Sequence, residues 1–334
     1  MYVCPMRPAG PAATVMAMTE LLYAAPGTHR AIRRTYPVPS ERSALTGMAL
    51  VRLVLAETRP GVQLVILLRV VSFFLSTAGP NVRAFAGTAA AGIAGWLSVG
   101  MAVYLLNGVT DILGDQVNGS RRPIASGRLP VATALRTTVF LAAAGLVLCA
   151  LCERRLVVLA VAFLILGYCY SVGPAALKST RMGFAIAVGG GAFLCYLAGS
   201  VMGGGLTPRL TAFGAVMALW VGLCSATKDL SDVAGDQLAG RQTWPVVLGD
   251  RGARRLISAI SLLLGCSFLA GAAVLAGPTR PAALVAGLGA VTLGAVVLRA
   301  PRRAGRAAGR RPYRTFMAVQ YAVNGAVLGS ALSW

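Results

Sequence analysis

The stretch that decides the fold is AFAGTAAAGIAGWLSVGMAVYLL, residues 84–106, which runs directly into NGVTDILGD, residues 107–115. The first part contains no charged residue and is long enough to cross a hydrocarbon core of about 30 Å as an α-helix. Two aspartates, Asp111 and Asp115, follow where the apolar run ends. The stretch therefore predicts a transmembrane helix that ends with carboxylates at one surface of the membrane.

The composition of the whole chain is that of a membrane protein. Hydrophobic residues make up 57% of the 334 residues, and charged residues make up 12% rather than the ~25% of average usage. The mean hydropathy is +0.72, and a soluble protein built from such helices would have no polar faces left for water. The predicted fold class is therefore an all-α membrane protein. Nine transmembrane helices are expected, at residues 62–80, 84–106, 130–150, 155–174, 183–203, 210–227, 254–276, 281–300 and 314–333.

The basic residues predict how the chain is oriented. The net charge is +21, and most of the 31 lysines and arginines lie in segments that the predicted helices place on one side of the membrane. The positive-inside rule then puts the N-terminus in the cytoplasm and the C-terminus outside, in a multi-pass protein of the cell (inner) membrane. The loop that carries Asp111 and Asp115 and a second loop, which carries Asp229, Asp232 and Asp236, are also placed in the cytoplasm. A basic surface that faces the anionic cytoplasmic leaflet explains the charge, so no nucleic-acid partner is expected.

The remaining segments carry weaker signals. Residues 1–43 show little periodicity and are expected to form a poorly ordered basic tail, whereas residues 44–334 are expected to form the membrane domain. The segment 43–60 has a helical pattern with Arg52 and Glu57 among apolar residues, which suits an interfacial helix. Cysteine spacing indicates neither a disulfide framework nor a zinc site, and the single histidine, His29, cannot build a metal cluster.

Half of the ten acidic residues lie in two clusters next to apolar runs. Asn107, Asp111 and Asp115 have the spacing i, i+4, i+8, which predicts one face of a helix. Asp229, Asp232 and Asp236 have the spacing i, i+3, i+7 and predict a second such face. Acidic groups in a membrane are costly and usually functional.

Oxygen ligands of this kind suit Mg²⁺, which binds few carboxylates and shares its other positions with waters and phosphate oxygens. Two acidic clusters with basic residues nearby therefore suggest two Mg²⁺ ions that clamp a diphosphate. The basic candidates are Arg121, Arg122, Lys178, Lys228 and Arg241. The alternative is that the aspartates merely solvate helix ends and pair with loop arginines, but acids at helix C-termini oppose the helix dipole.

Three motifs lie in order along the chain. The first comprises Asn107, Asp111, Asp115, Asn118, Arg122, Pro123 and Gly127, the second Lys228, Asp229, Asp232, Gly235, Asp236, Gly240, Thr243 and Pro245, and the third Tyr170, Ser171, Pro174 and Lys178. Together these motifs resemble those of the UbiA superfamily of intramembrane prenyltransferases. The sequence departs from the pattern at Gly108, where many members have Asp, and at Ala175 and Ala176, where some have Arg. The resemblance covers about residues 50–334, and the second motif looks most like the homogentisate and chlorophyll-synthase branch.

The resemblance implies nine helices around a central cavity, capped on the cytoplasmic side by the motif loops. It also implies Mg²⁺-dependent transfer of an isoprenyl group from an allylic isoprenyl diphosphate to an aromatic or similar acceptor within the bilayer. The expected catalytic residues are Asp111, Asp115, Asp232, Asp236, Lys178 and Tyr170, and the expected metal ligands are Asn107, Asp111, Asp115, Asp229, Asp232 and Asp236. Asn107, Asn118, Arg122, Lys228, Arg241, Arg69 and Ser171 are expected to bind the diphosphate or the acceptor.

Two questions stay open at this point. The first is whether the protein is a transferase or a terpene cyclase, because both reactions would begin with the same metal-assisted ionisation. A transporter is disfavoured, because the acidic residues lie on loops rather than at mid-bilayer. Arg69 lies inside the first span and either snorkels to the interface or points into the cavity. An allylic cation also needs aromatic walls, for which the candidates are Tyr104, Phe163, Tyr168, Tyr170, Phe193, Tyr196 and Trp220.

Overall fold

The computed structural model describes residues 47–274, 279–300 and 309–333, and the expected tail 1–43 lies outside this range. The described residues form helices and no β-strand. The helices are α3 (Gly47–Glu57), α4 (Pro60–Ala78), α5 (Val82–Thr110), α6 (Ile112–Val117), α7 (Val131–Cys152), α8 (Arg154–Ser171), α9 (Arg181–Met202), α10 (Pro208–Cys224), α11 (Val233–Leu238), α12 (Trp244–Val274), α13 (Thr279–Arg299) and α15 (Arg311–Leu332). Three short 3₁₀ helices, η1 (Gly79–Asn81), η2 (Leu177–Ser179) and η3 (Ser225–Ser231), lie between them.

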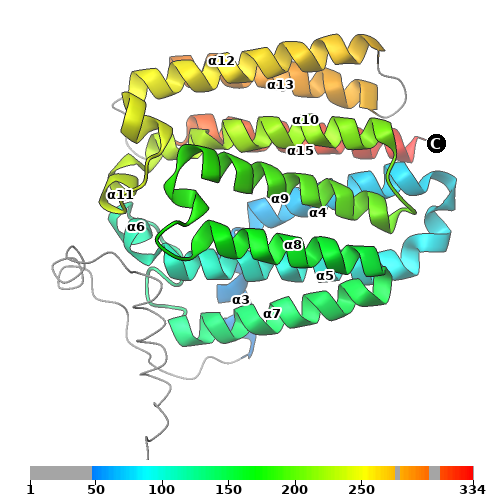
Figure 1. The fold of residues 1–334 in the computed structure, drawn as a ribbon, viewed down its shortest axis with the longest axis horizontal. Coiled ribbons are helices and arrows are strands. Elements are labelled where there is room, and N and C mark those ends of the chain that lie inside the picture. Colours follow the sequence, from blue (N-terminus) through cyan, green and yellow to red (C-terminus); the bar gives the residue numbers. More distant parts are fainter. Residues whose placement is uncertain (1–46, 275–278, 301–308, 334) are drawn as a thin grey trace, which may run out of the picture.

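The long helices run side by side and alternate in direction, so that every second connection lies at the same end of the bundle (Figure 1). The short helices α6 and α11 contact each other at that end, and the C-terminal end of α15 lies at the opposite end. This arrangement explains how two sequence motifs about 120 residues apart reach the same place.

Seven segments of the described chain are long and apolar enough to cross a membrane. The first, Pro60–Thr110, comprises α4, η1 and α5 together, and α15 is not among the seven. The all-α membrane fold predicted from the sequence is confirmed, but the count of nine spans is not. The difference arises from a short connection, which joins α4 to α5, and from the polar residues of α15, including Gln320 and Asn324 in its middle.

Small residues allow the helices to approach closely. A β-carbon at Gly199 of α9 would lie 2.3 Å from the carbonyl oxygen of Val70 in α4, and one at Gly222 of α10 would lie 2.5 Å from the carbonyl oxygen of Ala185 in α9. Such contacts are typical of membrane helices, whose association depends on van der Waals packing rather than on the hydrophobic effect. The close packing fixes α4, α9 and α10 around a central cavity.

Candidate active site

The two aspartate motifs have the same local structure. Asp111 lies between α5 and α6 with φ −102° and ψ 5°, and Asp232 lies between η3 and α11 with φ −115° and ψ 13°. Each is followed by a six-residue helix. The prediction that each cluster occupies one face of a continuous helix is therefore wrong, because both helices break at these aspartates. The second half of each motif forms a separate short helix, α6 or α11, at one end of the bundle (Figure 1).

The likeness of the motifs extends to their sequence. DILGDQVNG at 111–119 and DVAGDQLAG at 232–240 share Asp, Gly, Asp, Gln and Gly at the same spacing. The final glycines, Gly119 and Gly240, have φ angles of 61° and 66°, in the left-handed region that favours glycine. The Asn118 side-chain oxygen accepts a hydrogen bond of 3.1 Å from the Gly235 backbone N–H, which joins the two short helices directly.

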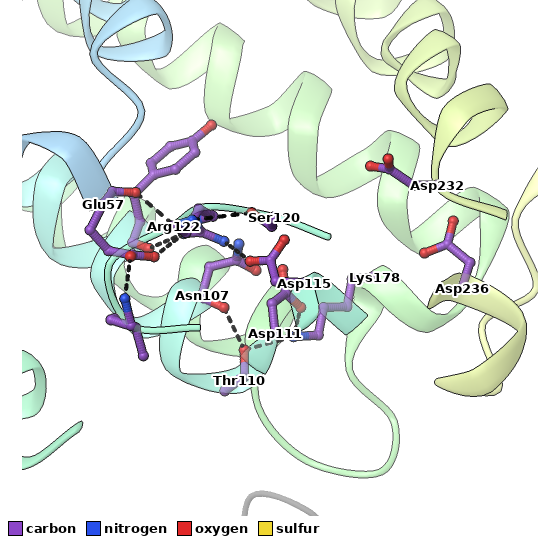
Figure 2. A network of polar contacts seen from close by, with 12 residues as sticks. Glu57, Asn107, Thr110, Asp111, Asp115, Ser120, Arg122, Lys178, Asp232 and Asp236 are labelled. Atoms are coloured by element: carbon purple, nitrogen blue, oxygen red, sulfur yellow. Dashed lines mark hydrogen bonds and ion pairs between the residues drawn. The ribbon is translucent and has the colours of Figure 1, made fainter. Parts of the chain in front are cut away.

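Asp111 lies at the centre of a network of ion pairs, of which Figure 2 shows the pair with Lys178. Its Oδ1 atom accepts a hydrogen bond from Lys178 Nζ at 2.9 Å and another from Arg241 Nη2. Arg241 also lies 3.3 Å from Asp236 Oδ1, so it connects the two motifs. The backbone N–H of Gln242 donates a 2.8 Å hydrogen bond to the Ser179 carbonyl, which holds the two cation-bearing loops together.

Burial and charge act in opposite directions on these groups. Burial raises the pKa of Asp111, but the nearby Lys178 and Arg241 overcome it and hold this pKa well below its usual range. Burial lowers the pKa of Lys178 despite its pairing with Asp111. Burial also raises the pKa of Asp236, against the opposing charges of Lys228 and Arg241. The first motif thus carries a firmly ionised carboxylate, whereas Asp236 carries a less stabilised one.

A second chain of ion pairs joins the first motif to α3. Arg122 Nη1 lies 2.7 Å from Asp115 Oδ2, and Arg122 Nη2 lies 2.7 Å from Glu57 Oε1. Because both ends of the guanidinium are occupied by carboxylates, the structure brings Arg122 to Asp115 rather than leaving it open for a phosphate. Glu57 was not among the site residues expected from the sequence, and an acid within an amphipathic helix was its only signal.

A central cavity opens beside the motifs. It contains about 1040 Å³ of empty space, part of it open to the outside. Asn107, Lys228 and Tyr170, three of the residues expected in the site, line it. Its walls come from α4, α5, α8, α9, α10 and α15 and include Tyr104, Phe163, Phe184, Tyr313 and Phe316.

The expected aromatic walls are only partly found. Tyr104, Phe163 and Tyr170 line the cavity, but Tyr168 is 57% exposed on the outside of the bundle and Phe193 lines a separate groove. Tyr196 and Trp220 are buried in the surrounding core and do not line it. Phe184, Tyr313 and Phe316 were missed, because apolar surroundings on both sides of a helix leave no polarity signal for its orientation.

Arg59 is a lining residue that the sequence interpretation missed. It precedes Pro60 at the start of α4 and has a φ angle of 58°, the only positive φ of a non-glycine residue among those described. Such strained conformations cluster at functional sites. Its pKa is raised even though burial alone would lower it, because Tyr313, Asp115, Tyr104 and Asp111 lie nearby.

Arg69 points inward rather than toward the membrane surface. Its side chain is buried, donates a hydrogen bond to Gln320 Oε1, and lies with its guanidinium carbon 5.8 Å from the centre of the Tyr196 ring. Arg69 and Gln320 both line the cavity. The sequence left open whether Arg69 snorkels to the interface or points into the cavity. The structure supports the second alternative.

The oxygen atoms near the mouth are suited to a hard cation. Asn107 Oδ1 and Asp236 Oδ2 are buried without a hydrogen-bond partner, which is unusual for buried acceptors. Asp229 and Asp232 are also buried, and Asp232 has Arg310 at 3.7 Å. In the described part of the chain no three His, Cys, Asp or Glu side chains converge as a ready-made metal cluster. Mg²⁺ is typically bound in proteins by one or two carboxylates together with substrate phosphates.

Asn118 and Ser171, two further residues expected in the site, differ in their contacts. Asn118 joins α6 to α11, as described above, and Ser171 is buried with its hydroxyl lacking a partner. Figure 2 shows Asp232 and Asp236 on one side and Asp111 and Asp115 on the other, with the Lys178 side chain directed at Asp111.

Comparison with known proteins identifies the family. A sequence model of the UbiA prenyltransferase family matches residues 65–319, which is most of the chain. The chain belongs to the UbiA prenyltransferase family. The resemblance inferred from the motifs is thus confirmed, although the homogentisate and chlorophyll-synthase branch is not. Together with its seven candidate spans, UbiA family membership makes this a multi-pass membrane protein.

Two curated relatives come from Hericium erinaceus. The diterpene cyclase eriG is 37% identical over 93 residues, which cover 28% of this chain and 29% of the relative. The polyprenyl transferase eriF is 32% identical over 170 residues, which cover 49% of this chain and 57% of the relative. The aligned stretches therefore span well under two thirds of either relative.

The fold is shared with a solved UbiA homologue from Archaeoglobus fulgidus, whose structure was determined with bound DMAPP and Mg²⁺. The TM-score is 0.65 at 18% sequence identity, and the match covers 83% of this chain and 99% of the homologue. At this identity the match shows that the two proteins share the UbiA fold.

Proposed function

We propose that the protein transfers an isoprenyl group from an allylic isoprenyl diphosphate to an aromatic or similar electron-rich acceptor within the membrane. The observation that carries the proposal is one cavity with two polar regions. Asn107, Lys228 and Arg59 line it near the aspartate motifs, and Arg69 with Gln320 lines it farther along. Arg69 is ten residues beyond Arg59, so it lies about 15 Å along α4. A diphosphate and an acceptor can thus be bound separately.

The basic residues around the mouth would bind the diphosphate. Lys228 and Arg59 line the cavity, and Lys178 and Arg241 lie beside it on Asp111. Ammonium and guanidinium groups bind phosphate oxygens through charge-assisted hydrogen bonds, as they bind carboxylates here. Binding of DMAPP by the Archaeoglobus fulgidus homologue supports this class of substrate.

The oxygen donors fit Mg²⁺, and the Mg²⁺ bound by the same homologue supports a metal-dependent reaction. The ligands would be drawn from Asn107, Asp111 and Asp115 in the first motif and from Asp229, Asp232 and Asp236 in the second. When bound, the metal would neutralise the diphosphate and make it a better leaving group. The buried acceptors on Asn107 and Asp236 without partners are the structural feature that such binding would satisfy.

The walls of the cavity would protect the allylic cation. Tyr104, Phe163 and Tyr170 present aromatic groups to the cavity, and aromatic faces attract cations. The apolar lining also excludes water, which would otherwise capture the cation. Arg69 and Gln320 would then bind a polar group of the acceptor and hold its ring against the cation.

Arg122 and Asn118 are proposed to act through other residues. Arg122 is bound on both sides by carboxylates, so it would orient Asp115 instead of binding the diphosphate itself. Asn118 would hold the two motif helices in register. Ser171 and Tyr170 remain candidates for substrate contact, because the Ser171 hydroxyl has no partner and Tyr170 lines the cavity.

A terpene cyclase on the same scaffold is the second candidate. The relative eriG is named a diterpene cyclase, and its 93 matched residues are 37% identical. In that reaction a double bond of the substrate itself would attack the cation. An acceptor site would then be unnecessary, and Arg69 and Gln320 would serve only as a polar border of the cavity.

Purified protein with Mg²⁺ and C10 to C20 allylic diphosphates tests the choice. A transferase releases diphosphate slowly alone and much faster with a phenolic or quinol acceptor, and its product contains both components. Rapid conversion of labelled diphosphate to a cyclic hydrocarbon or alcohol without an acceptor would establish the cyclase instead.

We further propose that the motif loops and the N-terminus face the cytoplasm and that the C-terminus lies outside, in the cell (inner) membrane. The basic residues of the loops beside α6, α9 and α11, including Arg121, Lys178 and Arg241, support this orientation. Residues 44–334 would form the single catalytic domain, of which the family match covers residues 65–319.

A further inference from the structure

Glu57 is a completely buried carboxylate at the last position of α3. An acid at a helix C-terminus opposes the helix dipole, so its placement needs another cause. Two contacts supply it: Oε1 lies 2.7 Å from Arg122 Nη2, and Oε2 accepts a 2.9 Å hydrogen bond from the Ile124 backbone N–H. Both partners belong to the part of the first motif that follows α6.

Arg122 is shared between Glu57 and Asp115 (Figure 2). Each terminal nitrogen of the guanidinium binds a different carboxylate, at 2.7 Å in both cases. The bond to Asp115 engages only its Oδ2 atom. Without the Glu57 carboxylate, Nη2 would keep only long hydrogen bonds to the backbone carbonyls of Glu57 and Tyr104, at 3.3 and 3.5 Å, and the guanidinium could turn toward Asp115, where a two-pronged pair is the favoured geometry. Arg122 would then compete with any other cation for both Asp115 oxygens.

Gly108 leaves the space that Glu57 occupies. A β-carbon at position 108 would lie 2.3 Å from Glu57 Oε1 and 2.9 Å from Arg122 Nη2. Any side chain there would displace the Glu57 carboxylate from its place beside Arg122. Position 108 and the Glu57 carboxylate therefore compete for one position next to the guanidinium, although 51 residues separate them in the sequence.

We propose that Glu57 is a positioning residue of the active site: it occupies one side of Arg122, so that Arg122 orients Asp115 through one oxygen and leaves the other free to bind a cation. The inference rests on the proposed function, in which Asp115 serves the metal and the diphosphate. It makes α3, which lies outside the three motifs, a part of the catalytic machinery.

The test moves the carboxylate beside Arg122 from α3, at position 57, to α5, at position 108. Glu57→Ala removes it, Glu57→Ala with Gly108→Asp restores it from α5, and Glu57→Ala with Gly108→Asn restores the shape without the charge. Each purified variant is titrated with Mg²⁺ in the presence of inorganic pyrophosphate, and the rise in melting temperature is followed. Diphosphate release from an allylic substrate is measured in parallel.

We expect Glu57→Ala to raise the Mg²⁺ concentration for half-maximal thermal shift by about ten- to hundredfold. Gly108→Asp alone should also be damaging, because its side chain collides with Glu57. The Asp double variant should recover most of the loss and the Asn double variant should not. Glu153→Gln, which removes a carboxylate from an exposed pair with Arg155, should match the wild type.

Three results would overturn the inference: an unchanged Mg²⁺ titration in Glu57→Ala, equal recovery by Asn and Asp at position 108, or no recovery by Asp. In each of these cases the wild-type protein would still respond to Mg²⁺ with pyrophosphate and release diphosphate. A wild-type protein that does neither would contradict the proposed function itself, and the inference with it.

Discussion

The Asn118 side-chain oxygen lies 3.1 Å from the backbone nitrogen of Gly235, whose N–H donates a hydrogen bond to it. The two residues are 117 positions apart, and each belongs to one of the two aspartate motifs. This bond, with the Arg241 bridge between Asp111 and Asp236, makes one site out of two segments.

The contact between the motif helices predicts different tolerances for two equivalent glycines. A β-carbon at Gly235 would lie 2.3 Å from the Asn118 side-chain nitrogen, whereas one at Gly114, the matching position in the first motif, would meet its nearest atom at 3.9 Å. Gly235→Ala should therefore reduce stability by about 1–3 kcal/mol and lower turnover. Gly114→Ala is the matched control and should do neither. Melting temperatures and diphosphate release check both; equal effects would contradict the proposed contact.

The two motifs also predict different consequences for loss of an aspartate. Asp232→Asn should lower turnover by about two orders of magnitude with little change in melting temperature, because the contacts of Asp232 are a long ion pair to Arg310 and a hydrogen bond from the neighbouring Ser231 hydroxyl. Asp111→Asn should lower both, because it leaves Lys178 and Arg241 without their shared carboxylate, at a cost of about 3–5 kcal/mol. A fully active Asp232→Asn variant would remove the second motif from the mechanism.

A change at Arg69 is expected to weaken acceptor binding without abolishing diphosphate release. Arg69→Met should raise the KM for the acceptor ten- to hundredfold, because a hydrogen bond to a charged group contributes about 1.5–3 kcal/mol. Slow release of diphosphate without acceptor should persist. Arg136→Met, which changes an exposed arginine of α7, is the control. Loss of acceptor-independent release in Arg69→Met would place Arg69 at the diphosphate instead.

The orientation predicts which positions a membrane-impermeant thiol reagent can reach. In a cysteine-free background, Arg121→Cys and Gln237→Cys should be labelled from the cytoplasmic side and Thr207→Cys from the outside. Arg121 and Gln237 lie at the end of the bundle with α6 and α11, and Thr207 precedes α10 at the other end. Labelling of positions 121 and 237 from opposite sides would be incompatible with one shared site.

The helical framework could be predicted from the sequence because membrane helices are long apolar segments. The expected span 130–150, for example, corresponds to α7 at Val131–Cys152. The residues of the aspartate motifs were also recognisable, since acids next to such segments are rare. Their local geometry was not, because the breaks at Asp111 and Asp232 depend on backbone angles that spacing alone does not determine.

Residues that act through long-range contacts were the hardest to find. Glu57 lies 65 residues from Arg122, and only the folded arrangement brings α3 against the part of the first motif that follows α6. The prediction of which aromatic residues line the cavity was only partly right, for a different reason. Lipid on one side of a helix and an apolar cavity on the other are chemically alike, so the sequence cannot show that Tyr168 faces out while Tyr170 faces in.

The most direct test of the central claim is a double-variant cycle on Mg²⁺-dependent diphosphate release, with Asp115→Asn in one motif and Asp236→Asn in the other. If the two motifs form one site, each single change should remove nearly all the catalysis, and the double variant should be hardly worse than either alone. Multiplicative losses, with the double variant slower by the product of the single effects, would show that the motifs act independently and would contradict the account.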